Sequence, residues 1–274
     1  MTLRLTTAAL LALLASVPAP ARAETVGCTA VTSLPATIST PGVYCLVGDV
    51  STAGTGPAIK IEASGVTLDC NGYKVGGLAA GPAAANTGII ASAKDDLLIR
   101  NCTVRGFLFG IHLDGHGNAV IGNRVEGSRD TGIRMHGSEM LVRDNLVYDT
   151  GLHVTDSSTI GIQVGGTGVV VGNTVDTVIA QPGSGASAFG IASSAGVGSL
   201  VARNRIRSVI ADEGGYARAV NIVGVSVSVR DNVVMGITGY GIDCYAGVVA
   251  SGNHVSASIG LDGCTDGGGN MVID

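Results

Sequence analysis

A short repeat runs through most of this chain and is marked in two independent ways. A Gly-Ile dipeptide recurs at spacings of 22, 22, 29, 29 and 51 residues, and Ala219-Val220 divides the last interval into 29 and 22. The dipeptides begin at Gly88, Gly110, Gly132, Gly161, Gly190 and Gly241. An asparagine recurs in register with them, at Asn101, Asn123, Asn145, Asn173, Asn204, Asn232 and Asn253. A period this short, rich in β-branched residues and glycine, predicts coils of parallel strands stacked on one another.

Each repeat contains three short runs in which apolar and polar residues alternate. In one repeat the runs span residues 111–114, 119–121 and 124–126. Ile111 and Leu113 share one face of the first run, and His112 and Asp114 share the other, because successive side chains of a strand alternate. This period of two, interrupted by glycine, argues against helices. One coil cannot bury its apolar face alone, but coils stacked at about 4.8 Å enclose a continuous core.

The repeated asparagine is predicted to be structural. It falls at the bend between the second and third runs, where an amide tolerates a left-handed backbone and bonds to the backbone of the turn. Stacked over seven coils, these asparagines should form a ladder that satisfies buried polar groups. A catalytic role for seven periodic asparagines is not expected.

Two further motifs indicate a family. Gly-Val-Thr-Leu-Asp-Cys-Asn-Gly spans residues 65–72, and Ile-Arg-Asn-Cys-Thr-Val spans 99–104. With the Gly-Ile coils they resemble a secreted group of right-handed parallel β-helix proteins of the pectin-lyase-like superfold, over roughly residues 40–274. The resemblance implies an all-β, single-stranded right-handed parallel β-helix of about eight coils with N- and C-terminal caps. It does not imply an activity, because the group includes lyases, hydrolases, epimerases, adhesins and periplasmic accessory proteins.

The chain is expected to be a single exported domain. Residues 1–23 resemble a secretory signal, with Arg4 before an apolar core and Ala21-Arg22-Ala23 as the cleavage site. The expected divisions are 1–23 signal peptide, 24–57 N-terminal cap, 58–260 parallel β-helix and 261–274 C-terminal cap. Cleavage leaves 14 basic residues against 21 acidic ones, a net charge of −7. We therefore expect a secreted or periplasmic protein that binds neither nucleic acid nor membrane.

The six cysteines are typical of an exported protein with three disulfides. The register of the repeat favours Cys28–Cys45, Cys70–Cys102 and Cys244–Cys264, because each pair falls in neighbouring coils or brackets an end. Six cysteines allow fifteen pairings, and a buried free pair at 70 and 102 is the alternative to the central bridge.

The outward positions of the first run gather charge in two adjacent coils. Coil by coil, the first outward position is Lys60, Ile90, His112, Arg134, Gln163, Ala192, Asn221 and Asp243, and the second is Glu62, Ser92, Asp114, His136, Gly165, Ser194, Val223 and Tyr245. His112 should lie one strand spacing from Arg134, and Asp114 one from His136, with His116 in the turn beyond. The four candidate catalytic residues are His112, Asp114, Arg134 and His136. The candidate substrate-binding residues are Lys60, Glu62, His116, Gln163, Asn221, Asp243 and Tyr245.

These residue types suit β-elimination from an acidic polysaccharide. A lyase needs a base that removes the proton α to a uronate carboxylate and a cation that stabilises the developing charge. Arg134 would neutralise the carboxylate, and His112 or His136 would take the proton, with Asp114 orienting His136. A hydrolase needs two carboxylates about 5–10 Å apart. Asp114 and Glu62 lie two coils apart, about 10 Å, which makes hydrolysis the weaker alternative.

Insertions that lengthen the coils precede the first run, at 77–87, 151–160, 180–189 and 211–218. Loops projecting there would form the side of a groove along the first sheet. In the enzymes that this chain resembles, the substrate binds along this sheet. The charged positions are equally typical of a solvated surface, so a non-catalytic extracytoplasmic adhesion or scaffold β-helix is the alternative function. No cofactor is expected. Calcium at Asp212-Glu213 is an alternative, as is a metal held by His112, His136 and Asp114. The sequence predicts no oligomeric state.

Overall fold

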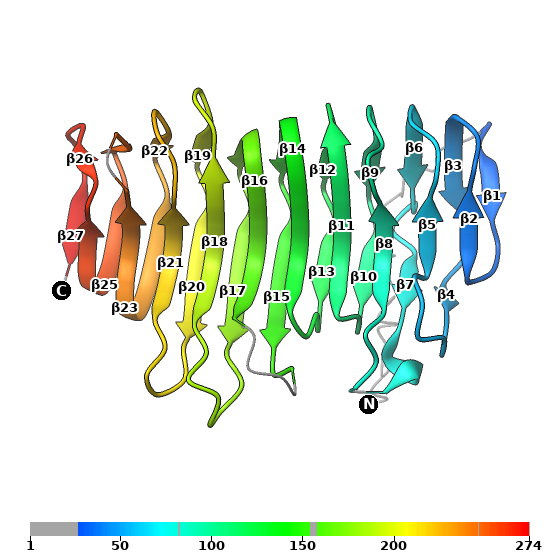
Figure 1. The fold of residues 1–274 in the computed structure, drawn as a ribbon, viewed down its shortest axis with the longest axis horizontal. Helices are drawn as coiled ribbons and strands as arrows, with labels where there is room; N and C mark the ends of the chain where they lie inside the picture. The colour runs from blue at the N-terminus through cyan, green and yellow to red at the C-terminus, as the bar shows by residue number, and fades with distance from the viewer. Residues whose placement is uncertain (1–26, 82, 154–157, 246, 274) are drawn as a thin grey trace, which may run out of the picture.

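A computed structural model describes residues 27–81, 83–153, 158–245 and 247–273 of the chain. It is a right-handed parallel β-solenoid of about nine turns, close to the eight coils expected, so the predicted fold class is confirmed. Strands of successive turns lie side by side along the long axis of the molecule (Figure 1). The expected signal peptide lies outside the described residues.

Every turn adds a strand to each of three parallel sheets. The first sheet contains β2 (Ala36–Ile38), β5 (Ile59–Ile61), β8 (Thr87–Ala91), β11 (Phe109–His116), the first parts of β14 (Thr131–Arg143) and β16 (Thr159–Val171), β18 (Ala188–Ala195), β21 (Ala217–Ile222), and the last parts of β23 (Val233–Cys244) and β25 (His254–Asp262). The second sheet contains β1 (Thr29–Val31), β3 (Gly42–Leu46), β6 (Val66–Asp69), β9 (Leu98–Arg100), β12 (Ala119–Ile121), the last parts of β14 and β16, β19 (Leu200–Ala202), β22 (Ser228–Arg230), β24 (Val249–Ser251) and β26 (Thr265–Asp266). The third sheet contains β4 (Val50–Ser51), β7 (Lys74–Gly76), β10 (Thr103–Arg105), β13 (Arg124–Glu126), β15 (Leu146–Gly151), β17 (Thr174–Ile179), β20 (Arg205–Ile210), the first parts of β23 and β25, and β27 (Met271–Ile273). Among the described residues the helical segment is one 3-10 turn, η1 (Leu78–Ala80).

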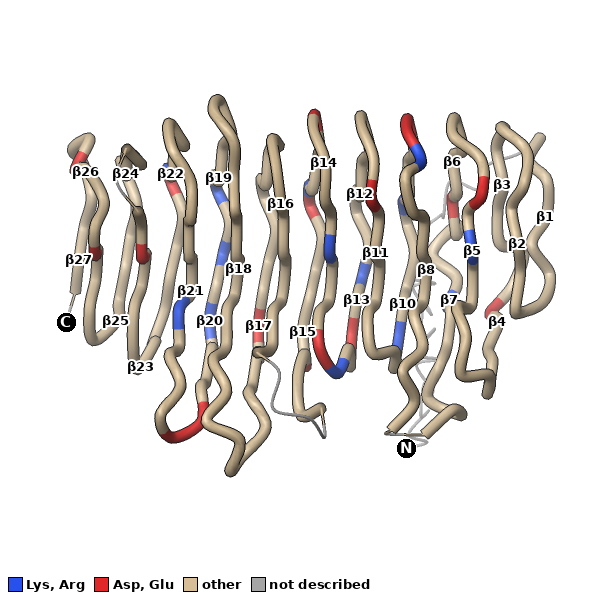
Figure 2. The backbone as a smooth tube through the Cα atoms, in the orientation of Figure 1, with Lys and Arg blue, Asp and Glu red and all other residues tan. Residues whose placement is uncertain are grey.

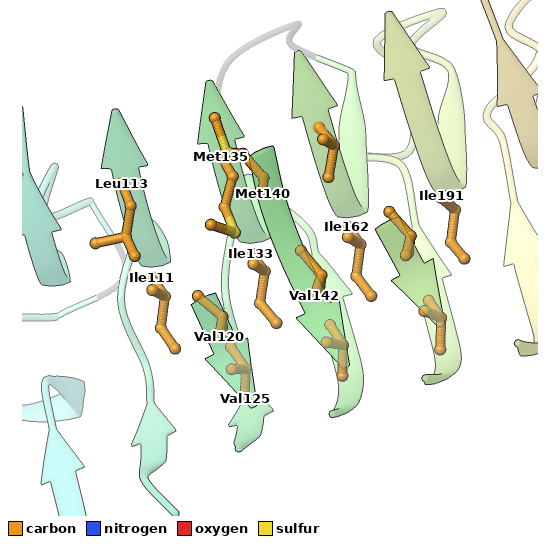
Figure 3. Close-up of a cluster of buried hydrophobic side chains, with 14 of the residues drawn as sticks. Ile111, Leu113, Val120, Val125, Ile133, Met135, Met140, Val142, Ile162 and Ile191 are labelled. Atoms are coloured by element: carbon orange, nitrogen blue, oxygen red, sulfur yellow. The ribbon is translucent and has the colours of Figure 1, made fainter. Parts of the chain in front are cut away.

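The core is a stack of aliphatic side chains from the inward positions of all three sheets. Ile111, Ile133, Ile162 and Ile191 follow one another through four coils, and each is fully buried (Figure 3). Val120 of the second sheet and Val125 of the third meet them inside the coil, also fully buried. Because each core residue contacts its equivalents in the coils above and below, the alternation in the sequence fixes which side chains face outward.

The glycine of the Gly-Ile repeat is required because neighbouring coils approach closely there. A Cβ on Gly132 would lie 2.5 Å from Val147 Cγ1 and 2.6 Å from the carbonyl oxygen of Gly161. The corresponding glycines from 88 to 241 meet the next coil in the same way. The repeat therefore records a packing constraint between the first sheet, the third sheet and the next coil.

The asparagine ladder forms, but it is shifted by one coil from the predicted set. It contains Asn123, Asn145, Asn173, Asn204, Asn232, Asn253 and Asn270. In each step the backbone N–H and the side-chain Nδ2 donate to the Oδ1 of the next asparagine, at 2.9–3.1 Å.

Asn101 lies outside the ladder, which corrects the predicted assignment. Cys102 occupies the equivalent position, and its N–H donates to Asn123 Oδ1 at 2.9 Å. Asn101 has φ +53°, the left-handed conformation, and in later coils that conformation belongs to the residue before the asparagine, such as Asp144 (φ +55°). The prediction that the ladder asparagine itself is left-handed is therefore wrong. The amide faces inward, and its neighbour makes the turn.

The three predicted disulfides are confirmed. Cys28–Cys45, Cys70–Cys102 and Cys244–Cys264 have Cα–Cα distances of 5.8, 4.6 and 4.9 Å. No free cysteine remains among the described residues. The expected cap boundaries at 57 and 261 stay predictions, although parallel strand pairing is already present at β2–β5 and continues to β25–β27.

The insertions before β18 and β21 project at one edge of the solenoid (Figure 1). They lie side by side and are joined by Asp212. Its carboxylate accepts a hydrogen bond from the Gly185 N–H at 2.7 Å, and its N–H donates to the Ala186 carbonyl at 3.2 Å. No helix in the part of the chain that the structure describes is long and apolar enough to cross a membrane.

Candidate functional site

The first sheet brings the four candidate catalytic residues together in the predicted register. His112 pairs with Arg134 and Asp114 with His136, on the neighbouring strands β11 and β14. All four side chains are half-buried on the outward face. The inward residues between them, Leu113 and Met135, are fully buried, so the register cannot slip without exposing core.

The contacts within this group differ from the expected ones. Asp114 Oδ1 lies 3.3 Å from Nε2 of His112, on its own strand. Nε of Arg134 donates to Nε2 of His136 at 3.1 Å. Asp114 therefore orients His112, and the expectation that it orients His136 is wrong. Residues two apart on one strand point the same way and meet directly, which the strand-to-strand register alone does not show.

Both histidines favour their neutral forms. Burial lowers the pKa of His112, and the positive charge of Arg134 lowers it further, while Asp114 partly opposes them. The pKa of His136 is lowered by burial and by Arg134. In neutral His112 the Nε2–H donates to Asp114, so Nδ1 holds the lone pair. In neutral His136 the lone pair on Nε2 already accepts from Arg134. His112 is therefore the better proton acceptor.

Phe109 completes this group and was not singled out from the sequence. Its ring centroid lies 5.8 Å from that of His112, and Arg134 Cζ lies 5.8 Å from the Phe109 ring. The apolar ring adds to the burial that holds the histidines neutral. Period-two alternation would place Phe109 inward with Ile111, but the alternation breaks at Gly110 and Ile111, which are both buried, and Phe109 is half-buried beside His112. The alternation therefore could not have identified Phe109 from the sequence.

Arg134 is a cation without an anionic partner. It forms no ion pair with any described residue, whereas most exposed arginines of the same chain do. An unpaired guanidinium on a half-buried face can bind a carboxylate in two parallel hydrogen bonds.

A hollow of about 490 Å³ adjoins this group on the first sheet. Its lining is Pro57, Lys60, Ile61, Glu62, Ile90, Ser92 and Lys94. Ile90 pairs directly with His112, so the hollow and the four-residue group are continuous along the sheet. Lys60 and Glu62 form an ion pair of 2.6 Å, and the hydrogen bond and charge of Lys60 lower the pKa of Glu62. A carboxylate held ionised in this way is a poor general acid, which weakens the hydrolase alternative further.

The other predicted substrate-binding residues follow the same sheet. Gln163 lies beside Arg134, and His116 is exposed, with Nδ1 2.6 Å from Ser138 Oγ. Asn221 pairs with Asp243, and Tyr245 is 60% exposed. Their roles in binding stay predictions.

Asp243, a candidate substrate-binding residue, is less available to a substrate than the sequence implies, because its carboxylate already has a partner. It pairs with Arg218, whose guanidinium carbon lies 4.6–5.6 Å from the ring centroids of Phe189, Tyr216 and Tyr240. The carboxylate is thus neutralised and shielded within an aromatic cluster. The sequence separates these residues by up to 54 positions (243 minus 189), so only the register of three strands assembles them.

No geometry among the described residues supports a metal site. No group of three or more His, Cys, Asp or Glu side chains converges there. Asp212, an alternative calcium ligand in the sequence, instead accepts backbone N–H groups of the neighbouring loop, chiefly Gly185 and Gly183, and these lower its pKa. Residues 154–157 of the insertion at 151–160 lie outside the described residues.

Comparisons with known proteins identify a fold family. The family model of the right handed beta helix region matches residues 87–273. A search of the curated proteins found no match. Among solved structures, the crystal structure of the Dettilon tailspike protein is similar, with 16% sequence identity and a TM-score of 0.41. The match covers 88% of this chain but only 57% of the tailspike chain.

Proposed function

This chain belongs to the right-handed β-helix family, and we propose that it binds an acidic polysaccharide along the first sheet and cleaves it by β-elimination. The unpaired Arg134 guanidinium, one strand spacing from a neutral His112 that is oriented by Asp114, is the observation that supports this proposal most. The hollow beside them would hold neighbouring sugar units. The pectin-lyase-like grouping and secretion remain part of the proposal.

In the proposed reaction, Arg134 binds the carboxylate of a uronate and stabilises negative charge as it develops there. Nδ1 of His112 accepts the proton from the carbon next to that carboxylate. The electron pair of the C–H bond forms a C=C double bond, the glycosidic C–O bond breaks, and the leaving oxygen takes a proton from water. Asp114 stabilises the imidazolium that His112 becomes.

Binding without cleavage is the second candidate. Beyond the four-residue group, the outward positions on β16 and β18 hold small or uncharged side chains, Gln163, Gly165, Ala192 and Ser194. A glycan lying there would contact surface without meeting a further acid or base. This favours a recognition surface on the late coils.

The test uses pectate, alginate and glycosaminoglycans, with and without calcium, and measures both binding and the ultraviolet absorbance of an unsaturated product. Arg134→Ala should abolish binding and cleavage, and His112→Gln should abolish cleavage while binding remains. Arg105→Gln is the control, because it also removes one arginine but lies on the third sheet, away from the four-residue group. Binding without product would favour the second candidate. No binding to any of these glycans would refute both.

A further inference from the structure

Eight of the eleven arginines after residue 23 lie on the second and third sheets or on the bend between them, away from the candidate site. They are Arg100, Arg105, Arg124, Arg143, Arg203, Arg205, Arg207 and Arg230. Five of them pair with carboxylates of the same face, at N–O distances of 2.7–3.5 Å. The remaining three form no ion pair with any described residue: Arg203, Arg205 and Arg230.

These three arginines are neighbours at one corner of the solenoid. Arg230 ends β22 and pairs with Ala202, and the Arg203 N–H donates to the Arg230 carbonyl at 3.1 Å. Arg205 begins β20, two residues beyond the left-handed Arg203 (φ +54°), or about 7 Å along the chain. All three side chains are exposed. Figure 2 shows basic segments following one another along this β19–β20 stretch. We call these three residues the arginine corner.

Placing three like charges together without ion-pair partners opposes folding slightly, because their repulsion is only partly offset. The earlier coils avoid this: Arg100, Arg105, Arg124 and Arg143 each have a carboxylate partner. Asp231, which takes the left-handed position of Arg203 one coil on, is the acid beside the corner, and it forms no ion pair with the described residues. With one acid beside three arginines that form no ion pair, the corner keeps a net positive charge, on a chain whose residues 24–274 carry a net charge of −7.

We propose that the arginine corner binds the sulfate or phosphate groups of a linear anionic glycan, at a site separate from the first sheet. Three guanidinium forks suit tetrahedral oxyanions, which offer several oxygens to parallel hydrogen bonds. A single anionic chain would meet mainly the local positive charge. An anionic membrane is a broad surface, so the net negative charge of the rest of the protein would oppose its approach. These properties favour a glycan as the occupant.

The test measures binding of dextran sulfate, with unmodified dextran as the neutral probe. The triple variant Arg203→Gln/Arg205→Gln/Arg230→Gln should weaken binding about tenfold or more and reduce the slope of log affinity against log salt by about three. The matched control is Lys74→Gln/Arg105→Gln/Arg207→Gln, which removes the same charge from third-sheet residues that are already ion-paired. It should bind within about threefold of the parent.

Further arms separate the alternatives. Replacing the three arginines by lysine should give an intermediate loss, because charge remains and the forked geometry does not. Arg134→Ala should leave dextran sulfate binding at the corner unchanged, so failure here and failure at the first sheet are distinguishable. If both triple variants lost the same affinity for dextran sulfate, binding would depend on overall charge and not on the arginine corner, and the proposal would be overturned. So would tighter binding to duplex DNA or to vesicles containing anionic lipid.

Discussion

Asn145 illustrates how a single residue holds two coils together. Its Nδ2 donates to the Val120 carbonyl at 2.9 Å and to Asn173 Oδ1 at 3.0 Å, while its Oδ1 accepts from the Asn123 backbone at 2.9 Å. The residue is 2% exposed, so water cannot replace these partners.

Asn145→Ala should therefore lower the free energy of unfolding by about 1–3 kcal/mol, as measured in urea. Ser226→Gly is the control, because Ser226 is exposed, lies outside the ladder and has a left-handed backbone that glycine accepts. If the two variants unfold at the same denaturant concentration, the ladder does not stabilise the coils in this way.

The two histidines of the candidate site give a pH dependence with a defined sign. Their pKa values are lowered by folding, so the folded protein binds these protons less tightly than the unfolded chain. The free energy of unfolding should then fall as the pH drops below about 6.5, the ordinary pKa of histidine, and passes through the lower folded pKa.

The variant His112→Gln/His136→Gln should show a shallower decline over that window, measured as thermal midpoints at a series of pH values. His254→Gln, at an exposed position of the third sheet, is the control and should follow the parent. An unchanged decline in the double variant would mean that other groups cause it. Cleavage, if present, should rise with pH through the folded pKa of His112, because only the neutral ring accepts a proton.

The insertions before β18 and β21 are bonded to each other and form one structural unit. Asp212 bonds the loop before β21 to the loop before β18, and Tyr216 N–H donates to Ser187 Oγ at 3.0 Å. Figure 2 shows the acidic tip of the later loop at the lower edge of the solenoid. Together the loops form one wall beside the late coils of the first sheet.

Asp212→Asn should loosen this wall, because a neutral amide is a weaker acceptor for the backbone N–H groups. Amide hydrogen exchange at Gly185 should quicken, and so should proteolysis between β17 and β18. In the parent, protonation of Asp212 should have the same effect in acid, since its lowered pKa means that the bonds persist until the pH falls below the ordinary range of aspartate. Glu213→Gln is the control. Exchange that is equally fast in both variants would count against the bond.

The two ends of the described solenoid differ in how far their inward side chains are exposed. In the first coil the inward residues Val31 and Ile38 are 7% and 2% exposed. In the last coil Val272 is 43% exposed, although it pairs with the fully buried core residue Val255. Each coil is stabilised by its neighbours, so a coil with one neighbour has about half the contacts.

Opening should therefore begin at the C-terminal end. Hydrogen exchange under native conditions should be fastest in β26 and β27, slower in β24, and slowest in the central coils. Selective loss of the Cys244–Cys264 bridge, through Cys244→Ser/Cys264→Ser, should spread fast exchange into β24 while β12 and β13 keep their protection. Uniform exchange along the solenoid would contradict this order.

Much of the architecture could be predicted from the sequence because the fold is a repeat. The Gly-Ile spacing follows from the close approach of coils at Gly132 and its equivalents, and period-two alternation places Ile111 inward and His112 outward. The same register brings Cys70 within 4.6 Å of Cys102 between Cα atoms. These features depend on neighbouring positions and on the spacing between coils, which the repeated Gly-Ile and Asn marks make visible along the chain.

Only the tertiary structure decided the direction in which side chains lean. In the structure the Asp114 carboxylate contacts His112 and the Arg134 guanidinium donates to His136, although the strand register alone favoured a contact between Asp114 and His136. The structure also showed that Cys102, and not Asn101, bonds to the first asparagine of the ladder, because Asn101 takes the left-handed turn position just before the inward-facing one. Rotamers, turns and ion pairs depend on atoms from several coils at once, whereas the sequence by itself determines the coil, its register and its core.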